Sequence, residues 1–159
     1  MYAVQLARTL GMNLLNHGVG GYYYEAASLD EKLGFKPDLI TVAYGGNEWK
    51  ICGSMADFVN MYSGYMEKLT GFYPDANIFI IPPTWRTTYN RVTALGTNYD
   101  LAEKIDSICS KYPNVKVLDG LKLVPHIEYF YDDGVHPTDE GFLHFSINLL
   151  SEIYKGICK

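Results

Sequence analysis

Basic residues are outnumbered in this chain. It holds 13 Lys and Arg residues against 18 Asp and Glu, which gives a formal net charge of -5 at pH 7. A protein that binds nucleic acid needs a basic surface to meet the phosphates. The charge balance therefore argues against nucleic acid as a main partner.

Long apolar runs are absent as well. No stretch approaches the ~20 consecutive apolar residues with which a helix crosses a bilayer. The opening residues 1–8 are amphipathic and lack the basic start and apolar centre of a signal peptide. We therefore expect no membrane span and a cytoplasmic location.

Cysteine is rare, with three copies. They are odd in number and follow no metal-ligand spacing: Cys52, Cys109 and Cys158. Free thiols in a reducing compartment are therefore expected rather than a disulfide framework. Three histidines also lack partners at ligand spacing: His17, His126 and His144. No metal ion is predicted.

A dinucleotide fingerprint is missing too. Gly18-Val19-Gly20-Gly21 is rich in glycine, but Tyr23 occupies the third glycine position of the Gly-x-Gly-x-x-Gly pattern. No organic cofactor is predicted. The segment either forms a plain turn or brings the backbone N–H of Gly21 close to a substrate, because glycine permits close approach.

The composition that is present fits one globular domain spanning residues 1–159. The chain is 48% hydrophobic and 19% charged. Helix and strand signals alternate, which is typical of an α/β fold with a parallel sheet. Helices are predicted over 3–10, 55–72 and 99–111 and from the cap Thr138 onward, and strands over 13–16, 39–44, 77–81 and 115–119.

An Asp three residues before a His precedes the last predicted helix. Asp133 and His136 form a compact general-base unit, because the carboxylate can hold one ring nitrogen while the other faces a substrate. Asp132 is the rival orienting carboxylate. A histidine alone would often be structural, but this spacing and the rigid Pro137 favour a catalytic role.

A second polar residue follows the predicted strand 39–44. Asn47 comes after Gly45-Gly46, so a simple turn former is the plain interpretation. Its amide also stands at the carboxyl end of a strand, where α/β sheets bind ligands. There it could stabilise an oxyanion, and Trp49 could wall a pocket.

Such groups normally serve a serine nucleophile, and no serine here stands in that context. The serines lie mostly in predicted helices or at their starts, and none follows a strand on a sharp glycine turn: Ser28, Ser54, Ser63, Ser107, Ser110, Ser146 and Ser151. Tyrosine, in contrast, is abundant, with 14 copies. Core filling explains this number, and an aromatic platform for a sugar ring or acyl chain at Tyr22-Tyr23-Tyr24 is the alternative.

Three segments together resemble a known family. Residues 16–21 (Asn-His-Gly-Val-Gly-Gly), 44–49 (Tyr-Gly-Gly-Asn-Glu-Trp) and 133–137 (Asp-Gly-Val-His-Pro) are similar to blocks two, three and five of the SGNH, or GDSL-like, hydrolases. Their order and separations match, and the resemblance covers essentially the whole chain. It implies a flavodoxin-like three-layer α/β/α sandwich with esterase or lipase activity.

Carried over by position, the resemblance implies a role for each candidate residue. Gly21 and Asn47 become oxyanion donors, His136 the base, and Asp133 its orienting acid. Glu48 stands where the family often has Asp, a change expected to preserve local hydrogen bonding. The family's first block, Gly-Asp-Ser after the first strand, should lie upstream of Tyr2, so we expect an N-terminally truncated domain that lacks the first strand.

These observations predict a serine ester hydrolase that removes a small acyl group from a carbohydrate or similar small-molecule ester, with its nucleophile outside this chain. Two alternatives remain open. One is a non-catalytic ligand-binding relative, and the other is an unrelated flavodoxin-like fold that binds a phosphorylated ligand at residues 18–21. The missing strand would lie between strands 13–16 and 39–44. A four-stranded parallel core is therefore expected, in which these two strands either pair directly or hold a segment of a neighbouring chain between them, with self-association through the incomplete sheet.

Overall fold

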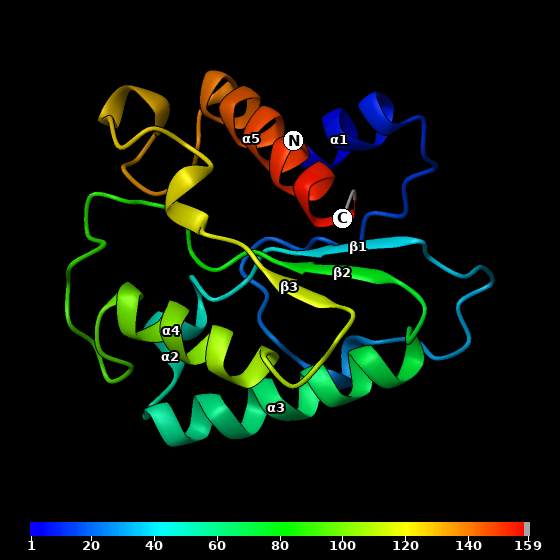
Figure 1. Ribbon diagram of the computed structural model, residues 1–159. Coiled ribbons are helices and arrows are strands. Elements are labelled where there is room, and N and C mark those ends of the chain that lie inside the picture. The colour runs from blue at the N-terminus through cyan, green and yellow to red at the C-terminus, as the bar shows by residue number, and fades with distance from the viewer. Residues whose placement is uncertain (158–159) are drawn as a thin grey trace. The chain divides into compact units, whose positions relative to one another are not determined.

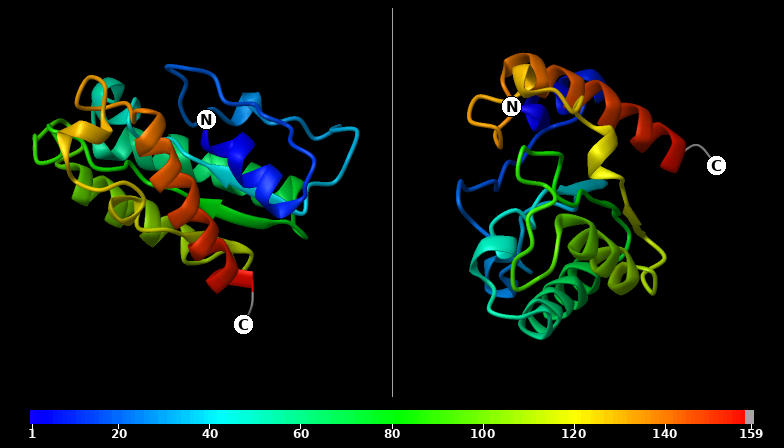
Figure 2. Two further views of the ribbon diagram at one scale, coloured as in Figure 1. Left: turned by 90° about the horizontal axis from the view of Figure 1, so that it is seen from above. Right: turned by 90° about the vertical axis from the view of Figure 1, so that its left-hand side faces the viewer.

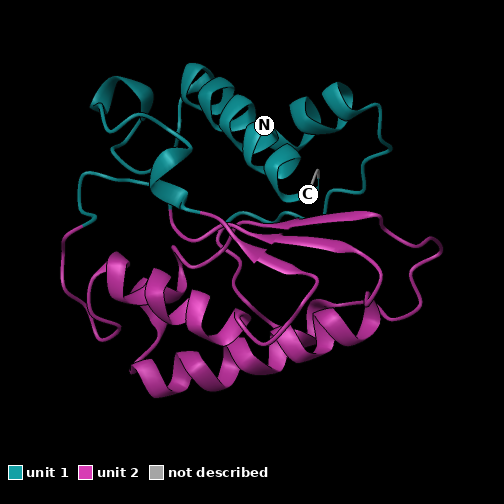
Figure 3. Cartoon of the chain, in the orientation of Figure 1, with its two compact units in different colours: residues 1–20, 84–89, 119–159 teal, residues 21–83, 90–118 magenta. Residues whose placement is uncertain are grey.

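The computed structural model describes residues 1–157 (Figure 1). The chain divides into two compact units, which are interleaved in the sequence (Figure 3). Unit 1 comprises Met1–Gly20, Thr84–Tyr89 and the chain from Asp119 onward. Unit 2 comprises Gly21–Pro83 and Asn90–Leu118.

A parallel sheet organises unit 2. Strands β1 (Leu39–Val42), β2 (Asn77–Ile80) and β3 (Val115–Val117) pair in the order β1-β2-β3. All three coincide with predicted strands, because short apolar runs between turn signals are typical of covered parallel strands. These strand predictions are confirmed, with ends one to two residues shorter than expected.

Two helices cover one face of this sheet. Helices α3 (Met55–Phe72) and α4 (Asn98–Cys109) pack against each other, and α4 also contacts β3 (Figures 1 and 2). Their apolar faces and the strands share one buried cluster, which includes Phe58, Met66, Ile78, Leu101 and Ile105. Burial of this kind contributes about 25 cal/mol per Å² of apolar surface. Both helices confirm the sequence prediction.

Unit 1 is built around two helices. Helix α1 (Tyr2–Leu10) packs against α5 (Asp139–Ile157), with the rings of Tyr2 and Phe145 4.6 Å apart. Helix α1 ends at Leu10 as predicted, and Gly11 follows it with a φ of 65°, which suits a residue without a Cβ. Thr138 caps α5 as predicted, since its Oγ1 accepts the Gly141 N–H at 3.1 Å.

Short helices complete both units. Unit 2 contains the 3₁₀-helix η1 (Ala26–Ser28) and the four-residue helix α2 (Glu48–Ile51), and unit 1 contains the 3₁₀-helices η2 (Gly120–Lys122) and η3 (Glu128–Phe130). The α2 helix was not predicted. None of the helices in residues 1–157 is both long and apolar enough to span a membrane.

The predicted strand at 13–16 is wrong. Residues 12–19 form neither helix nor strand and are exposed, including Leu14 at 44% and Leu15 at 47%. The two leucines between asparagines have the local pattern of a strand. A strand is stable only when it hydrogen-bonds to neighbouring strands, and this segment pairs with none of the described strands. The four-stranded core is therefore also wrong. The described residues form a sheet of three strands, and direct pairing of 13–16 with 39–44 does not occur.

Two of the three cysteines lie within the described residues. Cys52 is half-buried and Cys109 buried, and both are free thiols. The Cys109 Sγ lies 3.0 Å from the Tyr62 hydroxyl inside unit 2. Cys158 lies outside the described residues.

Candidate active site

The four candidate residues are divided between the two units. Gly21 and Asn47 belong to unit 2, and Asp133 and His136 belong to unit 1. Each half has its own local architecture, and each is described by itself.

The half in unit 1 is a tight turn before α5. The Asp133 Oδ2 lies 2.7 Å from Nδ1 of His136, while its Oδ1 accepts the backbone N–H groups of Val135 at 2.9 Å and His136 at 2.8 Å. Gly134 has a φ of 75°, which a side chain would strain. The turn is closed at its base, where the Asp132 N–H donates to the His136 carbonyl at 2.9 Å.

Hydrogen bonding fixes the charge state of Asp133. The backbone N–H of His136 is the largest cause, followed by the His136 ring and the backbone N–H of Val135, and together they hold the pKa of the Asp133 carboxyl well below its usual range. An ionised carboxylate can only accept, so Nδ1 of His136 carries the proton. In the neutral ring Nε2 is then an unprotonated acceptor.

Beyond the contact with Asp133, the His136 ring is largely exposed. The His136 side chain is 77% exposed, and its Nε2 makes no hydrogen bond to the described part of the chain. Asp132, the rival carboxylate, contributes its backbone N–H to the turn while Asp133 holds the ring. A positioned imidazole of this kind can remove a proton from a nearby hydroxyl or water.

The half in unit 2 joins two loops. Asn47 stands at the start of α2, and its Nδ2 donates to the Tyr22 carbonyl at 2.7 Å. This bond joins Asn47 to the Tyr22–Tyr23 peptide, one residue after Gly21. Gly21 is exposed with a φ of 78°, and no described residue accepts its backbone N–H. One amide hydrogen of Asn47 remains after the bond to Tyr22, since the group carries two.

A buried carboxylate ties the same two loops together. Glu48 is fully buried, and it accepts the backbone N–H of Tyr24 at 2.6 Å and of Gly45 at 2.9 Å. Burial raises the pKa of Glu48, and these backbone hydrogen bonds oppose the rise. Glu48 thus joins the backbone at Tyr24 to the backbone at Gly45.

The three tyrosines that follow Gly21 lie in two different environments. Tyr24 is fully buried, with its ring centroid 4.5 Å from that of Tyr62, so it fills the core. Tyr22 and Tyr23 are half-buried and stack on each other at 5.2 Å. The Tyr22 hydroxyl also bonds to the Glu25 carboxylate. Trp49 lies in the core of unit 2, where it is 2% exposed and its Nε1 donates to the Gly96 carbonyl at 3.1 Å.

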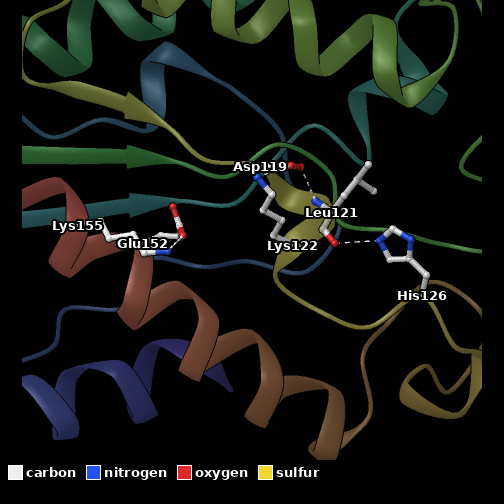
Figure 4. Close-up of polar contacts among 6 residues, drawn as sticks. All are labelled: Asp119, Leu121, Lys122, His126, Glu152 and Lys155. Carbon is white, nitrogen blue, oxygen red and sulfur yellow. Dashed lines mark hydrogen bonds and ion pairs between the residues drawn. The ribbon is translucent and has the colours of Figure 1, made fainter.

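Other polar residues hold structure. The His126 Nε2 lies 2.8 Å from the Leu121 carbonyl, as Figure 4 shows, and its ring stacks on Trp85 at 5.6 Å. Of the serines, Ser54 caps α3 and Ser28 ends η1. The others lie in or directly after helices, and none bonds to His136: Ser63, Ser107, Ser110, Ser146 and Ser151. Within residues 1–157, no three His, Cys, Asp or Glu side chains gather where they could hold a metal ion.

One neighbour of the His136 turn was not predicted. Thr87 donates its backbone N–H to the Gly134 carbonyl at 3.0 Å. The two residues are 47 positions apart, and an exposed threonine in a polar loop carries no sequence signal of such a contact.

Solved structures share this fold. A possible lipase from Chitinophaga pinensis is 16% identical, with a TM-score of 0.75 over 99% of this chain and 88% of its own. A putative GDSL-like lipase from Bacteroides ovatus is 20% identical, with a TM-score of 0.77 over 97% of this chain and 46% of its own. A family two carbohydrate esterase from Clostridium thermocellum, in complex with cellohexaose, is 19% identical, with a TM-score of 0.70 over 99% of this chain and 54% of its own.

The chain thus spans about half the length of the latter two proteins. At these identities the likeness shows the fold, and it confirms the predicted α/β class. No curated protein sequence matched the chain. The profile of the GDSL-like lipase/acylhydrolase family matches residues 1–142, which is most of the 159 residues. The chain therefore belongs to the GDSL-like lipase/acylhydrolase family.

Proposed function

We propose that this chain supplies the general base and two oxyanion donors of a serine ester hydrolase, and that the nucleophilic serine lies outside these 159 residues. The observation that carries the proposal is the Asp133–His136 pair. Its Nδ1 is held at 2.7 Å from the carboxylate while its exposed side chain leaves Nε2 available.

The chemistry follows from the protonation states. Nε2 of His136 takes the proton from the serine hydroxyl as the serine oxygen attacks the ester carbonyl. Asp133, ionised at neutral pH, stabilises the imidazolium that forms. The same nitrogen then gives its proton to the leaving alcohol, and water attacks the acyl-enzyme with His136 again as base.

The residues in unit 2 are assigned to the stabilisation of the oxyanion. The backbone N–H of Gly21 and the Nδ2 of Asn47 are the donors that we assign to it. Glu48 and the Asn47–Tyr22 bond fix the loops that carry them. Donors held in place before the reaction stabilise developing charge without a reorganisation cost.

A small acyl group on a carbohydrate is the proposed substrate. Support comes from the likeness to a carbohydrate esterase, and from the half-buried Tyr22–Tyr23 pair beside Gly21. Flat aromatic rings with polar tips suit the apolar faces of sugars. In the loop that follows β2, the half-buried Trp85 and the exposed Arg91 are further candidates for substrate contact.

A non-catalytic ligand-binding module is the second candidate. It is favoured by one observation: no described serine bonds to His136 or follows a strand. Such a module would use the same loops to bind an ester or sugar without cleaving it.

One experiment separates the two. The chain is expressed as it stands, and also extended by the residues encoded in frame upstream of Met1. Both are assayed with p-nitrophenyl acetate and with a serine-directed phosphonate. The proposal expects little hydrolysis by the chain alone, because a triad without its nucleophile retains only about 10³-fold catalysis over water. It expects robust, phosphonate-sensitive hydrolysis by the extended protein. An extended protein that is inert and unlabelled leaves the binding module as the function.

A further inference from the structure

The segment Thr84–Tyr89 belongs to unit 1, together with the His136 turn. It leaves β2 after Pro83 and forms a turn of its own, in which the Tyr89 N–H donates to the Arg86 carbonyl at 2.9 Å. Thr87 is the second residue of this turn. Its backbone N–H therefore faces outward from the turn and is available to another segment.

That segment is the Asp133–His136 turn. The Thr87 N–H donates to the Gly134 carbonyl at 3.0 Å, and the Thr87 hydroxyl lies 3.4 Å from the same oxygen. Gly134 is the residue between Asp133 and Val135, whose N–H the carboxylate binds. Holding its carbonyl fixes the peptide around which the Asp133 hydrogen bonds are arranged.

The Thr87 side chain also occupies the space beside Gly134. A Cβ on Gly134 would lie 2.6 Å from the Thr87 Oγ1 and 3.0 Å from its Cγ2. Gly134 must therefore lack a side chain for two separate reasons, its positive φ and this close approach. The Thr87 side chain thus fills the space that a side chain on Gly134 would need.

Arg86, the residue before Thr87, brings a positive charge near the same turn. Arg86 is buried at 7% exposure, and burial lowers the pKa of its guanidinium. Electrostatic interaction with Tyr89, Tyr131 and Asp133 opposes that shift. The Trp85 ring packs on Tyr131 at 5.2 Å, at the base of the His136 turn. The segment therefore contacts this turn through hydrogen bonds, rings and charge.

We infer that Thr87 is a positioning residue that acts through Gly134 to hold Asp133 against His136. The inference rests on the proposed function only in giving the pair a catalytic meaning. The contact itself can be tested on the chain as it exists, without any ester being cleaved.

The test is a titration by NMR of the isotope-labelled chain. Thr87→Pro removes the N–H, while proline is favoured at the second position of such a turn, so the Arg86–Tyr89 turn itself is retained. We expect the pKa of Asp133, read from its carboxyl carbon, to rise by about one unit as its hydrogen bonds loosen. The Nδ1–H proton of His136 should exchange faster with water.

Two controls separate positioning from general damage. Thr87→Ser keeps the N–H and hydroxyl, and Thr88→Ala changes the adjacent exposed threonine, which makes no hydrogen bond to the described residues. Both should titrate like the wild type. A Thr87→Pro chain with a native backbone spectrum and an unchanged Asp133 titration would overturn the inference.

A second pair of variants serves if Thr87→Pro does not fold. Gly134→Ala should disturb the Asp133 titration, and Thr87→Ala in the same chain should restore it in part, because it removes the two nearest atoms. Absence of any restoration would contradict the contact. If the titrations behave as expected but the extended protein cleaves no ester, the positioning stands and the proposed function fails.

Discussion

Asp133 makes three hydrogen bonds within one short turn, two to backbone N–H groups and one to the His136 ring. Its lowered pKa has a consequence for stability. A carboxyl whose folded pKa is depressed stabilises the fold above its unfolded pKa of about 3.9 and loses that contribution as the pH falls through the folded value. The turn should therefore hold its geometry at neutral pH and loosen in strong acid.

Removing the proposed base should cost more activity than removing the carboxylate that orients it. In the extended protein, we expect His136→Ala to lower kcat by at least ~10³-fold, because the group that we propose to take the serine proton is lost. Asp133→Asn should cost less, since an amide oxygen can still accept the backbone N–H groups of the turn. Steady-state kinetics on p-nitrophenyl acetate measures both. A near-normal rate for His136→Ala would identify another residue as the base.

Asn47 should act on the rate rather than on binding. An oxyanion donor interacts most strongly in the transition state, so Asn47→Ala should reduce kcat by roughly 10²–10³-fold and leave KM nearly unchanged. Asn47→Asp is the matched variant, which keeps the size but replaces the donor by a charge. If KM rose while kcat held, Asn47 would be a ground-state substrate contact instead.

Removing the Glu48 carboxylate should lower the free energy of unfolding, because it accepts two backbone N–H groups. Glu48→Ala leaves the N–H groups of Tyr24 and Gly45 without their acceptor, and each unsatisfied buried donor costs about 1–3 kcal/mol. Urea unfolding at pH 7 should show a loss of about 2–5 kcal/mol in the free energy of unfolding. A loss below about 1 kcal/mol would mean that water replaces the carboxylate.

The raised pKa of Glu48 adds a pH signature to the same residue. A carboxyl with a raised folded pKa contributes stability that is present below its unfolded pKa and is lost as the pH rises through the folded value. Glu48→Gln is the reference variant, because a glutamine side chain does not ionise. The stability of the wild type relative to Glu48→Gln should therefore improve as the pH falls from 7 toward 4. A difference independent of pH would contradict the burial argument.

At the scale of elements, α4 shows how much a cap contributes. Thr97 and Asp100 form a reciprocal capping box, in which the Thr97 Oγ1 accepts the Asp100 N–H at 3.3 Å and the Thr97 N–H donates to Asp100 at 2.7 Å. Thr97→Ala should lower the free energy of unfolding by about 0.5–2 kcal/mol. Thr97→Ser, which keeps the hydroxyl, is the control. Equal stability of the two variants would show that the box adds nothing.

Sequence periodicity predicted the elements that bury a continuous apolar surface. Strands such as Asn77–Ile80 and helices such as Met55–Phe72 were found because their own residues carry the pattern. The four-residue helix α2 was missed because a single turn shows no period. The strand at 13–16 was wrongly predicted because pairing depends on a distant partner, which local residues do not encode.

In the candidate site, too, local contacts were predictable from the sequence and distant contacts were not. The Asp133–His136 contact was predictable, since three residues of spacing and a glycine between them largely set its geometry. The Asn47–Tyr22 bond and the Thr87–Gly134 bond join residues 25 and 47 positions apart. Contacts over such separations depend on how loops are packed, and no local pattern announces them.

At the scale of the whole molecule, the edge of the sheet at β1 is the feature with the widest consequence. In the described part of the chain β1 pairs with β2 on one side and with no strand on the other. Three of its four residues are only partly buried, although parallel strands are usually covered on both faces. Unpaired edges recruit further strands, so we expect the chain to self-associate in a concentration-dependent manner.

The edge can be blocked without touching the existing ladder. Leu39 lies opposite Asn77, whose own N–H bonds to the Asp38 carbonyl, so the Leu39 N–H points away from β2. Leu39→Pro removes that outward donor, whereas Leu39→Ala shortens the side chain and keeps it. Size-exclusion chromatography with light scattering should show oligomers for the wild type and Leu39→Ala, and a shift toward monomer for Leu39→Pro. A wild type that stays monomeric at every concentration would show that this edge is protected by means other than strand pairing.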